Sequence, residues 1–144
     1  MNITVIGLGY VGLSQALLFS RKNRVFAYDS DHFKIVQLKS GKSPIDEPLV
    51  IDELKKENCN LIFTDELEKA ITLSDYAFIC VPTNFSEEKM AFDTMILETV
   101  LHQVFRLKKS IKAVIKSTVP VGFTTRLKQT ILCFLLNFYE KVIV

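Results

Sequence analysis

The sequence lacks the cysteine patterns that mark metal sites. Its three cysteines, Cys59, Cys80 and Cys133, are widely spaced, and no C-x-x-C motif or Cys/His cluster occurs among the 144 residues. This argues against zinc, and we expect no metal site. Cys80 falls in an apolar run expected to be a strand and Cys133 in one expected to be a helix, so both are predicted core residues. The odd number of cysteines is typical of a reducing cytoplasm, where we expect the protein.

Excess charge and long apolar runs are also missing. Eighteen basic against 16 acidic residues leave a formal charge of +2, too small to favour nucleic acid. The basic clusters, at residues 21–24 and 108–116, fall where helices should end, and cations stabilise helix C-termini. The most apolar run, residues 131–138, is too short to cross a bilayer, and the N-terminus begins with a predicted strand rather than a basic leader. We therefore expect neither nucleic acid nor a membrane as partner.

The composition that remains is that of one globular domain. Apolar residues make up 49% and charged residues 24% of the chain, with no sign of disorder, internal repeat or low complexity. A chain of 144 residues is long enough to bury a core.

Three glycines at the end of the first apolar run have the spacing G-x-G-x-x-G. The run, residues 3–6, is predicted to be a strand, and a helix is predicted to follow over residues 11–19. Gly7 lets the chain turn sharply, Gly9 lets a pyrophosphate approach the backbone, and Gly12 lets the helix pack on the strand. The helix N-terminus would present free N–H groups to the phosphates. The alternative is that the glycines serve only a tight turn.

A carboxylate stands where such a motif needs one. Asp29 ends the second predicted strand, residues 25–28, about 20 residues after the glycines, and there it can accept both hydroxyls of an adenine ribose. It would repel a 2′-phosphate, and Asp31 adds a second negative charge. The pattern therefore predicts a binding site for NAD rather than NADP.

Strands and helices alternate along the rest of the chain. Helices are expected at residues 31–38, 49–57, 66–73, 93–107 and 124–137, and strands at 61–63, 76–81, 113–116 and 141–144, with a polar loop at 85–92. This alternation predicts an α/β fold: a Rossmann-type, doubly wound parallel sheet of about six strands in the order 3-2-1-4-5-6, with helices on both faces. The loops at 7–12, 82–84 and 117–122 should then line one crevice.

These loops resemble those of a known family. Gly7-Leu-Gly-Tyr-Val-Gly-Leu13, Ser43-Pro-Ile45, Val81-Pro-Thr83 and Lys116-Ser-Thr-Val-Pro-Val-Gly122 together resemble the UDP-glucose/GDP-mannose dehydrogenases, with the nearest likeness to the bacterial UDP-glucose 6-dehydrogenases. The likeness runs along essentially the whole chain. It implies oxidation of the C6 alcohol of a nucleotide sugar to a carboxylate in two steps with two NAD+, which for UDP-glucose gives UDP-glucuronate.

The resemblance also implies roles for single residues. The backbone at Tyr10 and Val11 would meet the pyrophosphate. Lys34 stands where the family has a basic residue after the ribose-binding acid. Thr83 would contact the cofactor. Thr118 would lie beside the nicotinamide and the reacting carbon as the catalytic hydroxyl. Asn84-Phe85 replaces the Asp-Tyr of many bacterial relatives, a change that bears on substrate contacts.

The chain stops short of the family's catalytic parts. Relatives continue after the last strand with a glutamate loop, a lysine and asparagine on a long helix, and the nucleophilic cysteine. Cys80, inside a strand, is not a candidate. We therefore expect residues 1–144 to be an NAD-binding domain, either excised or naturally truncated. It would be inactive alone, meet a UDP-sugar only with the missing half, and be prone to self-association through exposed apolar surface.

Two other functions fit part of the pattern. Another β-hydroxyacid-type dehydrogenase would also begin with an NAD domain, although the string from Ser117 to Gly122 argues against this. A stand-alone NAD-binding regulatory module would need no catalytic half.

Overall fold

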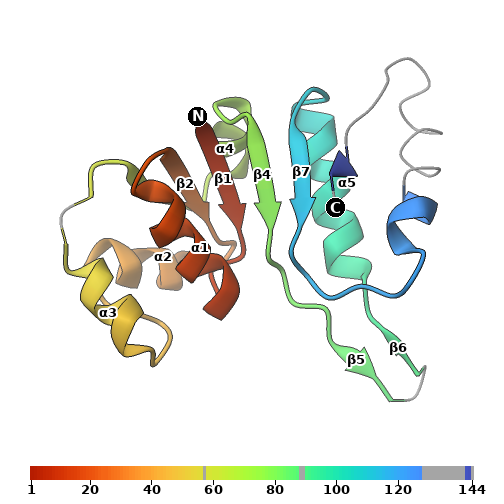
Figure 1. Cartoon of the computed structure of the whole chain (residues 1–144), viewed down its shortest axis with the longest axis horizontal. Coiled ribbons are helices and arrows are strands. Elements are labelled where there is room, and N and C mark those ends of the chain that lie inside the picture. Colours follow the sequence, from red (N-terminus) through yellow and green to blue (C-terminus); the bar gives the residue numbers. More distant parts are fainter. Residues whose placement is uncertain (57, 88–89, 128–141, 144) are drawn as a thin grey trace.

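The computed structural model describes residues 1–56, 58–87, 90–127 and 142–143 (Figure 1). Within these described residues, six strands form a parallel sheet in the order β3-β2-β1-β4-β7-β8. Their bounds are β1 Asn2–Ile6, β2 Arg24–Tyr28, β3 Leu61–Thr64, β4 Tyr76–Ile79, β7 Lys112–Ile115 and β8 Val142–Ile143. Numbered along the chain among themselves, these strands have the predicted order 3-2-1-4-5-6. The predicted doubly wound fold is therefore confirmed.

The strands form here because their residues are apolar and mostly β-branched or aromatic, as buried parallel strands require. The register aligns Ile6 of β1 with Tyr28 of β2 and with Ile79 of β4. The loops that leave these strands therefore start at the same edge, the carboxyl edge of the sheet.

Within the described residues, five helices that can be given both bounds cover the two faces of the sheet. They are α1 Tyr10–Ser20, α2 His32–Lys39, α3 Pro48–Leu54, α4 Leu67–Thr72 and α5 Met95–Leu107. Figure 1 shows α1 in front of the sheet and α4 and α5 behind it. Successive residues of β1 serve the two sides: Ile3 and Val5 pack with the first three helices, whereas Ile6 packs with α4 and α5. This is the period-two alternation of a strand buried on both faces.

Some predicted boundaries are wrong. The helix expected over 49–57 ends at Leu54, and the strand expected to reach residue 81 ends at Ile79. The helix expected from Asp31 begins at His32, because the Asp31 carboxylate caps it by accepting the Lys34 N–H. Residues 123–127 are helical, and most of the helix predicted over 124–137, with Cys133, lies outside the described residues.

Two short strands pair antiparallel within the segment predicted to be a loop, and we call this pair the hairpin. Its strands are β5 Phe85–Ser86 and β6 Ala91–Phe92. The rings of Phe85 and Phe92 meet edge to face with centroids 5.3 Å apart, which stabilises the pairing. In Figure 1 the hairpin extends beyond the carboxyl edge of the sheet.

Among the described residues, no helix combines the length and the apolar character needed to cross a membrane.

Candidate functional site

A cleft of about 940 Å³ lies at the carboxyl edge of the sheet. The loops after β1, β2, β4 and β7 contribute to it, and so do the N-terminus of α4 and one side of α5. The three loops predicted to share a crevice therefore meet in one cavity. Every predicted site residue except Gly12 lines it: Gly7, Gly9, Tyr10, Val11, Asp29, Lys34, Thr83 and Thr118.

The three glycines have different surroundings. Gly7 has a φ of +90°, a conformation that other residues rarely adopt, and its N–H donates to the Tyr28 carbonyl at 2.9 Å. A Cβ on Gly12 would lie 1.8 Å from the Gly7 carbonyl oxygen. A Cβ on Gly9 would meet no atom within 4 Å. Gly7 and Gly12 are therefore required by the fold, whereas the space beside Gly9 is left open toward the cleft.

The N-terminus of α1 faces the cleft without a capping side chain. Gly9 is the N-cap residue, and the first turn contains no acidic residue. The first N–H groups of a helix have no partner within the helix and carry a partial positive charge. An anion in the cleft beside Gly9, Tyr10 and Val11 would satisfy these donors.

Asp29 is buried, and three donors of the chain hold its carboxylate. Oδ2 accepts from the Leu8 N–H and from Lys34 Nζ, both at 2.8 Å, and Oδ1 accepts from the Asp31 N–H at 3.0 Å. Burial alone would raise the pKa of Asp29, but the hydrogen bonds from Lys34, Leu8 and Asp31 bring it below its ordinary value. The carboxylate is therefore ionised at neutral pH.

These contacts change the expected geometry of ribose binding. A carboxylate offers about four lone-pair positions, and three of them are used within the chain. A ribose diol that made both of its hydrogen bonds to Asp29 would have to displace one donor, and the side chain of Lys34 is the one that can rotate away.

Two hydroxyl groups join the loops after β4 and β7. Thr83 Oγ1 donates to the Thr118 carbonyl at 2.7 Å, and Ser117 Oγ donates to the Val81 carbonyl at 2.6 Å. Thr118 is exposed. We call these two hydrogen bonds the loop clasp. The clasp fixes the position of the Thr118 backbone relative to the loop that follows β4.

Cys80 also lines this cleft, next to the glycine loop. Burial raises the pKa of its thiol to about 11, although Lys116 lowers it slightly. The thiol is therefore protonated at neutral pH and is a poor nucleophile.

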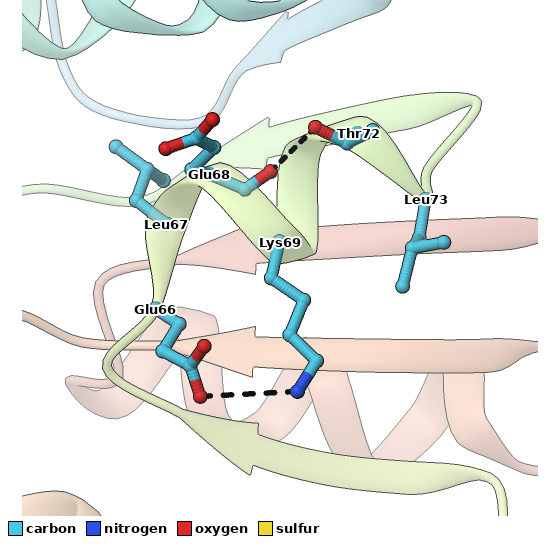
Figure 2. Close-up of a pocket in the computed structure, with 6 residues that line it drawn as sticks. All are labelled: Glu66, Leu67, Glu68, Lys69, Thr72 and Leu73. Carbon is cyan, nitrogen blue, oxygen red and sulfur yellow. Dashed lines mark hydrogen bonds and ion pairs between the residues drawn. The ribbon is translucent and has the colours of Figure 1, made fainter.

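A second hollow lies over α4 (Figure 2). Its polar groups pair with one another. Lys69 Nζ lies 3.8 Å from Glu66 Oε1, and Thr72 Oγ1 donates to the Glu68 carbonyl at 2.7 Å. Figure 2 shows these residues on a short, open surface of a single helix. Nothing in this hollow suggests chemistry. Within the described part of the chain, no group of three or more His, Cys, Asp or Glu side chains could hold a metal.

Comparison with known proteins identifies the family. The NAD-binding domain of the UDP-glucose/GDP-mannose dehydrogenase family matches residues 1–135. The chain belongs to this family. Its cofactor is NAD, and the predictions of family, cofactor and NAD-binding domain are confirmed.

Relatives with this domain are much longer. The chain is 37% identical over 131 residues to the UDP-glucose 6-dehydrogenase of Campylobacter jejuni, covering 90% of this chain and 33% of that protein. It resembles the GDP-mannose dehydrogenase of Pseudomonas aeruginosa, solved as a ternary complex, with a TM-score of 0.80 and 34% identity. The match covers 88% of this chain and 30% of that one. It also resembles the UDP-D-ManNAc dehydrogenase of Pyrococcus horikoshii, with a TM-score of 0.86 and 28% identity. This match covers 98% of this chain and 34% of that one. The chain thus spans about a third of its relatives.

The open space beside Gly9 and the uncapped helix N-terminus fit the diphosphate of NAD. The cleft also contains residues that the sequence analysis did not single out: Tyr28, Leu67, Ile96, Val100 and Gln103. The sequence spacing could have indicated three of them, because residues 96, 100 and 103 form an i, i+4, i+7 stripe beside the buried stripe of α5.

Proposed function

We propose that the cleft binds NAD along its length. The diphosphate would lie on the N-terminus of α1, over Gly9 and against the N–H groups of Tyr10 and Val11. The adenine ribose would meet Asp29 and Lys34, and the nicotinamide would lie toward Thr83 and Thr118. The observation that carries this proposal is the open space at Gly9, because there a diphosphate can reach the helix N-terminus without a side chain in the way.

We propose that NAD is preferred over NADP. The ionised Asp29 would repel a 2′-phosphate, and Asp31 lines the same cleft. Lys34 offsets part of this charge, but its ammonium already pairs with Asp29. The net field at the ribose therefore remains unfavourable to a phosphate.

We propose that the complete protein oxidises a nucleotide sugar, with UDP-glucose as the first candidate substrate. The Campylobacter relative is a UDP-glucose 6-dehydrogenase, and similarity to the family implies oxidation at C6. Bound NAD supplies the hydride acceptor. The residues of this chain hold the cofactor, and the loop clasp holds Thr118, whose hydroxyl would help to position substrate or water beside the nicotinamide.

Residues 1–144 are proposed to be the cofactor domain alone, without turnover. Aldehyde oxidation through a covalent intermediate needs a thiolate, and the raised pKa of Cys80 makes it unsuited to that role. The relatives carry about two thirds of their length outside the matched region. We propose that the nucleophile and most of the sugar site lie there.

Calorimetric titration of the chain with NAD+ and with NADP+ tests the cofactor proposal. We expect saturable binding of NAD+ and at least about tenfold weaker binding of NADP+, a difference of about 1.4 kcal/mol. Equal affinities for the two dinucleotides would contradict the proposal that Asp29 meets the adenine ribose. An assay of NADH formation with UDP-glucose and NAD+ tests the proposal that residues 1–144 are a cofactor domain only. Turnover by the isolated chain would refute it.

A further inference from the structure

Charge is unevenly distributed along the cleft. In the described part of the chain, the charged side chains that line it are Asp29, Asp31, Lys34 and Lys116. The first three lie together after β2, where two carboxylates and one ammonium leave a net negative charge. Lys116 lies at the other end, directly after β7, and none of the described residues that line this end is acidic. The cleft is therefore negative at one end and positive at the other.

The strand before Lys116 directs this side chain to the face of the sheet that α1 covers. Ala113 and Ile115 of β7 pack with the cluster that contains the buried face of α5. Lys112 lies on the opposite face, where its Nζ is 5.0 Å from the centroid of the Tyr76 ring, and Tyr76 packs with the cluster that contains the buried face of α1. Since side chains alternate along a strand, Lys116 leaves the sheet on the same face as Lys112.

Backbone pairing holds Lys116 beside the glycine loop. The Lys116 N–H donates to the Ile79 carbonyl at 2.9 Å, and the register pairs Ile79 with Ile115, so that Cys80 lies next to Lys116. Burial raises the pKa of the Cys80 thiol while the charge of Lys116 lowers it, as expected for two groups within electrostatic reach. A Cβ on Gly12 would lie 3.2 Å from the Cys80 Cβ. Lys116 therefore enters the cleft next to the glycine motif.

A cation at this end of the cleft acts differently on the two forms of the cofactor. The nicotinamide ring is positively charged in NAD+ and neutral in NADH. In the proposed reaction a hydride, with its two electrons, leaves the alcohol carbon for this ring, and the proton of the hydroxyl group is released to water. A nearby ammonium repels the oxidised ring and has little effect on the reduced one. It therefore favours transfer of the hydride to the ring.

From this charge distribution, and resting on the proposed binding of NAD with its nicotinamide toward Thr83 and Thr118, we infer that Lys116 makes the bound cofactor a stronger oxidant by weakening NAD+ relative to NADH. The negative end of the cleft, at Asp29, lies beside the adenosine half, whose charge does not change in the reaction. Lys116 thus acts on the proposed reaction through its charge, and the preference for NADH should follow that charge.

The test compares the affinities of three ligands for the full chain and for the Lys116→Met variant. Calorimetry measures the dissociation constants of NAD+, NADH and ADP-ribose, which has the diphosphate and both riboses but no nicotinamide. Lys116→Met should bind NAD+ at least about threefold more tightly and leave NADH and ADP-ribose almost unchanged. A threefold change in the ratio of the NAD+ and NADH dissociation constants corresponds to about 14 mV in the reduction potential of the bound couple.

Three further variants sharpen the result. Lys116→Arg keeps the charge and should have the same ratio as the unmodified chain. Lys116→Glu reverses the charge and should shift the ratio further than Lys116→Met, in the same direction. Lys109→Met removes a positive charge from an exposed position outside the cleft and should leave the ratio as it is in the unmodified chain. Circular dichroism confirms that each variant is folded.

The outcomes separate the inference from the proposal on which it rests. If Lys116→Met weakens all three ligands by the same factor, Lys116 pairs with the diphosphate, and the inference is wrong while the NAD site stands. A ratio that stays the same in both Lys116→Met and Lys116→Glu also overturns the inference. If the unmodified chain binds none of the three ligands, the proposed function fails first, and the inference is overturned with it.

Discussion

At the scale of single residues, the glycine motif serves both the fold and the proposed binding of NAD, and substitutions can separate the two. Gly12 is needed by the fold, because its Cβ would lie 1.8 Å from the Gly7 carbonyl oxygen, whereas a Cβ on Gly9 would meet nothing within 4 Å. Gly9 also has a φ of −82°, which alanine adopts readily. A substitution at Gly9 can therefore test the proposed role in NAD binding without disturbing the fold.

We predict opposite effects for the two alanine variants. Gly9→Ala should change the free energy of unfolding by no more than about 0.5 kcal/mol, because nothing clashes, yet weaken NAD+ at least about tenfold by placing a methyl group where the diphosphate approaches. Gly12→Ala should cost more than about 4 kcal/mol. Urea unfolding and calorimetry check both. Unchanged NAD+ affinity in a folded Gly9→Ala variant would contradict the proposed position of the diphosphate.

The pair of Asp29 and Lys34 predicts a dependence on pH. The folded-state pKa of Asp29 lies below its ordinary value despite burial, so the ionised carboxylate contributes stability that is present above the unfolded pKa and lost as pH falls through the folded pKa. In Lys34→Met, burial remains but the ammonium is gone, so the pKa should rise and acid destabilisation should begin at a higher pH. At pH 7 the variant should lose on the order of 1–3 kcal/mol.

Carbon-13 NMR titration of the Asp29 carboxyl, with urea midpoints at pH 7 and pH 4, measures both effects. Lys42→Met is the control, because it removes the same charge at an exposed position outside the cleft. An Asp29 pKa that stays the same in Lys34→Met would show that the backbone N–H groups of Leu8 and Asp31 alone keep it low.

The sequence predicted which residues would meet at this cleft because the motif is local. The positions of Gly7, Gly9 and Gly12 relative to Asp29 follow from one strand-helix-strand unit. The partners of Asp29 could not be foreseen in the same way. Its contact with the Leu8 N–H depends on the register of β1 against β2, and its contact with Lys34 depends on a rotamer.

At the scale of elements, the strands and helices with clear periodicity were predicted and the hairpin was not. Each strand of the β5–β6 hairpin has two residues, too few for alternation to be visible. The contact between Phe85 and Phe92 that stabilises it joins residues seven apart. The part of the cleft lined by α4 and α5 was not predicted for a related reason, since Leu67 and Gln103 meet the same cavity only after these helices have packed on the sheet.

The loop clasp predicts how the Thr118 loop responds to loss of a hydroxyl. Ser117→Ala removes the hydrogen bond to the Val81 carbonyl, which should cost about 1 kcal/mol and speed amide hydrogen exchange at residues 117–118 more than in β4. Ser40→Ala is a matched control, because its hydroxyl also donates to a backbone carbonyl, that of Gln37, but far from the cleft. Exchange that is equally slow in both variants would mean that the Thr83 bond alone holds the loop.

At the scale of the whole molecule, the sheet places every proposed cofactor contact at one edge. Figure 1 shows the hairpin extending past that edge. There the exposed fractions of Met90, Met95 and Phe85 are 77%, 68% and 50%. The hairpin and the start of α5 thus add an apolar surface beside the mouth of the cleft. A surface of this kind favours association with another protein surface.

We predict that the isolated chain self-associates through this surface. Sedimentation velocity over a range of concentrations should show a rising average mass, because burial of apolar area favours contact between copies. The double variant Met90→Lys, Met95→Lys should shift the distribution toward monomer. The double variant Leu18→Lys, Leu73→Lys is the control, since it adds the same charge at exposed apolar positions elsewhere. A chain that stays monomeric at high concentration would contradict the prediction. If the control variant dissociates equally well, added charge is the cause and not the hairpin surface.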